Sequence, residues 1–367
     1  MKVLALASYP VQAAATRYRL EQFVVPLADR GITLSVRPFL HSKLFAQLYQ
    51  RRAIPSTAAG LLKSGLLRFK DLFSAGGMDV VFVQREAMMF GPPVIEWLMT
   101  RAYARPMVLD LDDATYVPYT SPTYGRLGKA LKWFGKTDDL IRWASIVTCG
   151  NRAIAEYVLS KGTKAQVIPT VVDTERFRPV PRMDPDRRKL VLGWVGTHST
   201  FPYLQSIFPV LQQLARRHTF RLKIVGAGRR QISVPGVEVE NCEWKIDREI
   251  EDFQSFDIGL YPIVTGLYAD EWAAGKSGFK AIQYMAVGIP YVASPVGAVR
   301  EIGELGTTHY CASRHGEWQA ALDNLMMDRE RRESMGAAGR RHAVEHFGLE
   351  AQADKLAAVL REAAGGS

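Results

Sequence analysis

Residues 275–294, GKSGFKAIQYMAVGIPYVAS, decide the fold of this chain. A short loop bounded by Gly275 and Gly278 precedes a helical pattern of apolar residues. Gly288 and Pro290 end that pattern, and a continuous apolar run typical of a buried parallel strand follows. The stretch therefore predicts a loop, a helix and a strand of an α/β fold.

Two lysines stand at the start of this predicted helix. Lys276 precedes the helix and Lys280 lies in its first turn. The unpaired N–H groups and the positive dipole end of a helix N-terminus attract anions. Both ammonium groups can converge on one bound group, so the pattern predicts a diphosphate site. The alternative is a pair of solvated lysines on a surface helix.

Strand-like apolar runs alternate with helical patterns along the whole chain, as in parallel α/β proteins. In the first half the runs are residues 3–7, 33–38, 80–83, 107–111, 146–149 and 166–169. In the second half they are residues 190–195, 220–225, 237–239, 257–262, 291–294 and 309–311. A proline-rich, charged segment without periodicity at 170–189 separates the two sets.

The linker predicts two Rossmann-like domains, with parallel sheets facing across a cleft. We expect an N-terminal, acceptor-side domain at 1–172 and a C-terminal domain at 190–346 that binds the nucleotide. The last amphipathic helix, 349–364, is placed to pack back on the first domain.

Composition limits the function classes. The chain has 367 residues, 47% of them hydrophobic, and 47 Lys and Arg against 37 Asp and Glu, a net charge of +10. These values exclude a disordered chain and predict an anionic partner. No nucleic-acid-binding motif occurs, so no nucleic acid is expected. The three cysteines are far apart in the sequence, and we expect them to be buried free thiols. No apolar run approaches the ~20 residues that a membrane-spanning helix needs. We expect a cytoplasmic protein, peripheral on the inner face of the membrane.

The stretch 41–73 concentrates positive charge among apolar residues. Its only acid is Asp71, and its cations are Lys43, Arg51, Arg52, Lys63, Arg68 and Lys70. Cationic amphipathic helices suit an anionic membrane surface, which we therefore expect as a partner. The alternative is an ordinary pair of surface helices with the apolar side on the core.

Several segments in order resemble GT-B glycosyltransferases of family 4, the "glycosyl transferases group 1" type. The stretch 275–294 resembles their nucleotide-sugar-binding segment. Further matching segments are LGWVGT at 192–197, LKIVGAG at 222–228, FDIGLYP at 256–262, Val296-Gly297 with Glu301, and IPTVVD at 168–173. The resemblance is strong over the second domain and weak over the first.

The resemblance implies transfer of a sugar from a nucleotide-diphosphate sugar to a hydroxyl of a glycan or lipid-linked acceptor. It implies a hexosyltransferase type, retention of configuration, no cofactor, no metal, and a role in cell-surface polysaccharide or glycoconjugate synthesis. A nucleotide-sugar 2-epimerase or a non-catalytic GT-B scaffold remains the alternative. The nucleotide base and the sugar stay open.

The chain departs from the family at two places. Where many relatives carry two glutamates, it has Gly275 and Gln283, with Asp270 or Glu271 as nearby substitutes for the first. No Arg or Lys follows Gly196 in 197–200, so Lys276 and Lys280 become the phosphate ligands. The resulting donor-binding set is Gly196, Thr197, Gly226, Trp244, Lys276, Ser277, Gly278, Phe279, Lys280 and Gln283.

Acidic and basic side chains follow the strand-like runs of the first domain. Asp110, Asp112 and Asp113 stand at the end of one run, where a carboxylate can position an acceptor hydroxyl or receive its proton. Helix capping by solvated acids is the alternative. The predicted catalytic residues are Asp112, Asp113, Lys276 and Lys280. The predicted acceptor-binding residues are Arg17, Arg19, Arg85 and Asp110.

Overall fold

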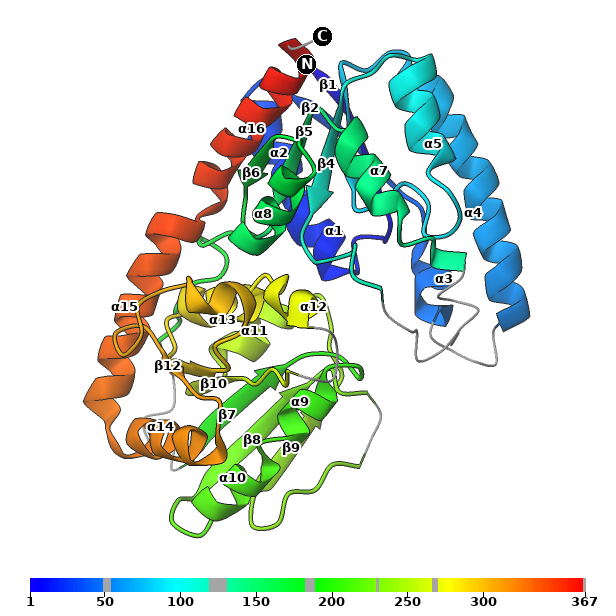
Figure 1. Cartoon of the computed structure of the whole chain (residues 1–367). Helices are drawn as coiled ribbons and strands as arrows, with labels where there is room; N and C mark the ends of the chain where they lie inside the picture. Colours follow the sequence, from blue (N-terminus) through cyan, green and yellow to red (C-terminus); the bar gives the residue numbers. More distant parts are fainter. Residues whose placement is uncertain (49–53, 119–130, 182–188, 229–230, 266–269, 366–367) are drawn as a thin grey trace. The chain divides into compact units, whose positions relative to one another are not determined.

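The computed structural model describes residues 1–48, 54–118, 131–181, 189–228, 231–265 and 270–365 (Figure 1). Its contacts group the chain into two units. The first unit comprises Met1–Val171, Tyr268–Ser277 and Leu349–Ser367, and the second comprises Val172–Leu267 and Gly278–Gly348.

The first unit is built on a six-stranded sheet in the order β2-β1-β3-β4-β5-β6, with every neighbouring pair parallel. The strands are β1 (Lys2–Ala7), β2 (Thr33–Pro38), β3 (Val80–Gln84), β4 (Met107–Leu111), β5 (Ile146–Cys149) and β6 (Ala165–Val167). The three strands β3, β4 and β5 are buried along their whole length. This explains why their sequences are continuous apolar runs rather than alternating ones.

The same unit also contains α-helices. They are α1 (Ala14–Arg19), α2 (Val24–Asp29), α3 (Ser42–Gln47), α4 (Ile54–Ala75), α5 (Val94–Trp97), α7 (Lys136–Trp143), α8 (Arg152–Ser160), α12 (Asp270–Ala274) and α16 (Leu349–Gly365). Helix α16 packs against α2 and against β3 and β4. Arg30, just after α2, pairs with Glu350 at 3.0 Å and Asp354 at 2.7 Å on α16. The C-terminal helix is therefore part of the first unit.

The second unit carries another six-stranded parallel sheet, in the order β12-β11-β10-β7-β8-β9. Its strands are β7 (Leu190–Val195), β8 (Phe220–Val225), β9 (Glu238–Cys242), β10 (Ile258–Tyr261), β11 (Tyr291–Ala293) and β12 (Tyr310–Cys311). Its α-helices are α9 (Phe201–Gln205), α10 (Phe208–Leu214), α11 (Glu249–Gln254), α13 (Phe279–Ala286), α14 (His315–Met327) and α15 (Arg329–Phe347). The strand order reverses between β7 and β10, where α/β sheets commonly bind ligands.

All twelve strand-like runs of the sequence overlap strands of the two sheets, and the predicted parallel α/β architecture is confirmed. In the described part of the chain, no helix combines the length and apolar character needed to cross a membrane.

Helix α4 is fastened to the first sheet by a buried arginine. The Arg68 side chain is 1% exposed. Its guanidinium donates to the carbonyl oxygens of Ala7, Arg37 and Ala87, each at 3.0 Å, and pairs with Asp71 at 3.0 Å. The expectation that Arg68 offers its charge to a membrane is therefore wrong, because its donors are used to hold β1, β2 and the segment after β3. Arg51 and Arg52 lie outside the described residues.

Replacing Arg68 with Met is expected to lower the free energy of unfolding by about 2–4 kcal/mol, because three carbonyl oxygens each lose a hydrogen bond and Asp71 loses its ion-pair partner. Urea denaturation followed by circular dichroism measures the change. Lys70→Met, at an exposed position of the same helix, is the matched control and should shift stability by less than about 0.5 kcal/mol. Equal effects of the two substitutions would contradict this role of Arg68.

Candidate functional site

Three loops of the second unit meet at the carboxyl ends of β7, β8 and β9. Gly226, after β8, has φ +88°, and a Cβ atom there would lie 2.2 Å from the carbonyl oxygen of Gly196, after β7. The same atom would lie 3.4 Å from Cβ of Trp244, after β9. Only glycine allows this approach. Gly196, Gly226 and Trp244, all predicted to bind the donor, are thus brought together, with exposed Thr197 beside them.

Helix α13 begins at a glycine that no other residue could replace without strain. Gly278 has φ +65°, in the left-handed region, and a Cβ atom there would lie 2.4 Å from the Ile302 side chain. The next residue, Phe279, is buried at 8% exposure. The first N–H groups of α13 have no acceptor within the helix, as at any helix start. The predicted loop and helix are therefore present, with Phe279 buried at the first position of the helix.

Lys280 and Gln283 form a hydrogen-bonded pair on α13. The Lys280 ammonium donates to Gln283 Oε1 at 2.9 Å, and Gln283 Nε2 donates to Glu249 Oε1 at 3.4 Å. The ammonium also lies over the rings of Phe253 and Phe279, at 5.2 and 5.7 Å. Gln283 is fully buried, so its clearest role is to orient Lys280. Contact of Gln283 with a ribose stays a prediction.

Lys276 and Ser277, in contrast, belong to the first unit. The Lys276 ammonium lies 3.2 Å from Asp113 Oδ2 and 3.3 Å from the centre of the Trp272 ring. Burial lowers the pKa of Lys276, and the neighbouring Asp113 carboxylate only partly offsets this. Asn151 Nδ2 donates to the Lys276 carbonyl oxygen at 3.2 Å and fixes the backbone. Lys276 and Lys280, which were predicted to bind one diphosphate, therefore belong to different units.

The place of the missing first glutamate has no room for a side chain. A Cβ atom at Gly275 would lie 2.4 Å from Cβ of Ala114 and 2.9 Å from its backbone nitrogen. The residue before Ala114 is Asp113, so a carboxylate stands one residue from this contact and pairs with Lys276. The side chains of Asp270 and Glu271, the substitutes considered above, lie outside what the structure describes.

Asp112 is held by Arg85 in a bidentate pair. Arg85 Nε lies 2.5 Å from Asp112 Oδ1, and Nη2 lies 2.8 Å from Oδ2. Burial by itself raises the pKa of Asp112, but the charge and hydrogen bonds of Arg85 outweigh it and leave the pKa below its usual range. Asp112 is therefore a fixed, ionised hydrogen-bond acceptor and a weak base. Arg85 has φ +62°, a strained value of the kind found at functional sites.

The other predicted acceptor-binding residues serve the fold. Arg19 and Asp110 are 3% and 0% exposed and form a two-bond ion pair. Thr148 Oγ1 donates to the same carboxylate at 2.6 Å, and Arg19 Nη1 donates to the Ile168 carbonyl oxygen at 2.5 Å. We assign this pair to holding β4, β5 and the segment after β6 together. Arg17 is half-buried and donates to the Val11 and Gln12 carbonyl oxygens.

Among the described residues, no group of three or more His, Cys, Asp or Glu is arranged to hold a metal ion. The described residues do include a cavity of about 320 Å³ in the second unit, lined by Ser294, Arg300 and Trp318 among others. None of these was predicted from the sequence, because they come from separate segments and share no motif.

Residues 189–328 match the protein family described as "Glycosyl transferases group 1". No curated protein is similar enough to this chain to give a match. Solved structures share the fold at low identity. Anabaena HepE in complex with UDP-glucose superposes with a TM-score of 0.70 and 15% identity, over 99% of this chain and 100% of that one.

Two more solved structures agree. Sucrose-phosphate synthase from Thermosynechococcus elongatus gives a TM-score of 0.69 at 14% identity, over 100% of this chain and 99% of that one. A glycosyltransferase from Rickettsia africae gives 0.70 at 13% identity, with the same coverage. At these identities the likeness establishes the fold. The chain therefore has the GT-B fold, and its residues 189–328 match the family model of the group 1 glycosyltransferases.

Proposed function

We propose that the chain transfers a hexosyl group from a nucleotide-diphosphate sugar to a hydroxyl of a glycan or lipid-linked acceptor. The transfer retains configuration, needs no cofactor or divalent metal, and serves cell-surface polysaccharide or glycoconjugate synthesis. The observation that carries the proposal is the meeting of Gly196, Gly226 and Trp244 in the unit whose helix α13 begins at Gly278 and bears Lys280.

The second unit suits the donor. Glycines at Gly196 and Gly226 let a ligand approach the backbone closely, and Trp244 offers a flat apolar ring beside them. The start of α13 attracts a diphosphate, and Lys280 adds a positive charge in its first turn. A departing diphosphate needs such positive charge, and an ammonium group can supply it in place of a metal ion. HepE, whose structure was solved with UDP-glucose, has the same fold.

The first unit suits the acceptor. Asp113 is partly exposed, with 26% of its side chain accessible, and is bound to Lys276. In the proposed step the bond from the anomeric carbon to the phosphate oxygen breaks and a bond to the acceptor oxygen forms. The acceptor proton passes to the departing phosphate oxygen. Asp113 accepts a hydrogen bond from a neighbouring hydroxyl of the acceptor and so orients the attacking one, while ionised Asp112 holds Arg85.

We also propose that α4 lies on an anionic membrane surface. Leu62, Leu66, Phe69 and Phe73 recur at three- and four-residue spacing and are 69%, 64%, 42% and 80% exposed. They therefore form one exposed apolar stripe. Lys63 and Lys70 are exposed and each follows a stripe residue by one position, so both flank the same side. Apolar residues beside cations complement a bilayer with acidic headgroups, on the cytoplasmic side.

Replacing Lys280 with Met is expected to weaken UDP binding about tenfold or more, because the diphosphate loses a charge-assisted donor. Isothermal titration calorimetry measures the Kd. Lys245→Met removes an exposed charge from the same unit and should leave the Kd unchanged. An unchanged UDP affinity of the Lys280→Met variant would contradict the assignment of Lys280 to the phosphate site.

Replacing Asp113 with Asn is expected to lower kcat roughly tenfold to hundredfold, because the acceptor hydroxyl loses its positioning group. Release of UDP from UDP-sugars in the presence of acceptor glycans measures turnover. UDP affinity should not fall, and Asp139→Asn, whose side chain is 45% accessible in the same unit, should change neither quantity. Weakened UDP binding with normal kcat would place Asp113 on the donor side instead.

Replacing Lys63 and Lys70 with Ser is expected to weaken binding to phosphatidylglycerol vesicles about thirtyfold, since each surface cation contributes about 1 kcal/mol and about 1.4 kcal/mol is a factor of ten. Serine at Leu62, Phe69 and Phe73 should weaken it further, also at high salt, where the lysine contribution is screened. Vesicle co-sedimentation measures both effects. The double substitution of Arg152 and Lys355 with Ser, at exposed positions of α8 and α16, is the matched control and should leave vesicle binding unchanged. Equal binding of all variants would overturn the membrane proposal.

A further inference from the structure

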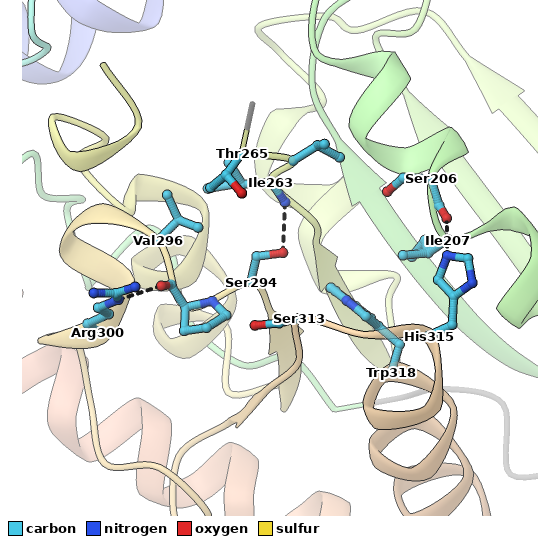
Figure 2. A pocket seen from close by; sticks show the side chains of 12 residues that line it. Ser206, Ile207, Ile263, Thr265, Ser294, Val296, Arg300, Ser313, His315 and Trp318 are labelled. Atoms are coloured by element: carbon cyan, nitrogen blue, oxygen red, sulfur yellow. Dashed lines mark hydrogen bonds between the residues drawn. The ribbon is translucent and has the colours of Figure 1, made fainter. Parts of the chain in front are cut away.

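The cavity of about 320 Å³ in the second unit lies at the carboxyl ends of β10, β11 and β12 (Figure 2). The segments after these strands, Ile263 to Thr265, Ser294 to Val296 and Ser313, form part of its wall. The start of α14 and the segment between α9 and α10 close the rest. Its volume lies within the range of small-molecule sites, and carboxyl ends of parallel strands are where α/β folds bind ligands.

The lining of this pocket combines apolar side chains with hydroxyl groups. Trp318 and Ile207 are each 2% exposed and form the apolar part. Figure 2 shows the Trp318 ring and the Ser294 and Ser313 side chains around the same space. Ser294 Oγ accepts the Ile263 N–H at 3.0 Å, which leaves its own hydroxyl hydrogen to donate to a ligand. An aromatic ring with nearby hydroxyls is the surface that suits a sugar, which has apolar C–H faces and polar edges.

The rim carries an arginine that is anchored but not neutralised. Arg300 Nε donates to the Pro295 carbonyl oxygen at 2.6 Å, which orients the guanidinium group. Its side chain is exposed, and among the described residues no carboxylate pairs with it. The pocket lining contains neither Asp nor Glu. The two terminal amino groups of such a guanidinium match the geometry of phosphate oxygens.

The pocket is separate from the proposed donor site. None of the predicted donor-binding residues lines it. The segment from Ser294 to Ile302 divides the two, because Ser294 and Arg300 line the pocket while Ile302 contacts Gly278 at the start of α13. A ligand in the pocket therefore does not need the groups that hold the diphosphate.

We propose that this pocket is a second ligand site, which binds a phosphorylated monosaccharide with its phosphate on Arg300 and its sugar ring on Trp318 and Ser294. The inference stands independently of the proposed transferase activity. It concerns binding by the second unit and needs no acceptor or turnover.

Calorimetric titration of the full chain with glucose 6-phosphate, inorganic phosphate and glucose tests the proposal. Glucose 6-phosphate should bind more tightly than either of the others. Arg300→Gln should weaken its binding about tenfold or more, and Ser294→Ala should weaken it to a smaller extent. Arg341→Gln, an exposed arginine of α15 in the same unit, is the matched control and should have no effect.

The donor-site variant separates the two sites. Lys280→Met should leave glucose 6-phosphate binding intact, and Arg300→Gln should leave UDP binding intact. Sugar phosphate binding that is lost in Lys280→Met and kept in Arg300→Gln would assign the ligand to the donor site and overturn the proposal. Absent binding, equal binding of inorganic phosphate, or equal binding of neutral glucose would also overturn it.

Discussion

The seating of α13 on the second sheet controls the proposed donor site. Tyr284 is fully buried, and its hydroxyl donates to the carbonyl oxygens of Gly193 in β7 and Leu260 in β10, at 3.2 and 3.0 Å. Gly259 in β10 makes this possible, because a Cβ atom there would lie 2.6 Å from the Tyr284 ring. One side chain thus ties the helix to both strands at the point where the strand order reverses. Lys280, one turn earlier, is placed by the same contact.

Three ion pairs of the first unit involve the carboxylates at and after the end of β4, and they differ in how exposed they are. Arg19 with Asp110 is buried and holds strands together. Arg85 with Asp112 is partly buried, and Lys276 with Asp113 is the most accessible. Buried pairs must be fully bonded, because an unpaired buried charge is costly. A pair at the surface can exchange its partner for a ligand. This gradient explains why Asp113, rather than Asp112 or Asp110, is the carboxylate we assign to the acceptor.

The strand runs were predictable because buried parallel strands need continuous apolar sequence, and the glycine positions because close approach excludes side chains. The role of Arg68 was not predictable. Within 41–73 it resembles its neighbours Lys63 and Lys70, and only the packing of α4 on three chain segments shows that it is buried. The pocket of Ser294, Arg300 and Trp318 was missed for a related reason, since its residues come from different loops and helices.

The sequence by itself determined the two parallel sheets, the glycine turns of the second unit and the loop before α13, because these depend on local pattern and backbone sterics. Only the tertiary structure decided which charges are paired. Lys276 and Asp113 are far apart in sequence, and Gly275 against Ala114 shows why no carboxylate stands where relatives carry one. The local sequence shows which charged and polar groups a segment carries. The partners of those groups depend on which distant segments the fold brings within hydrogen-bonding distance.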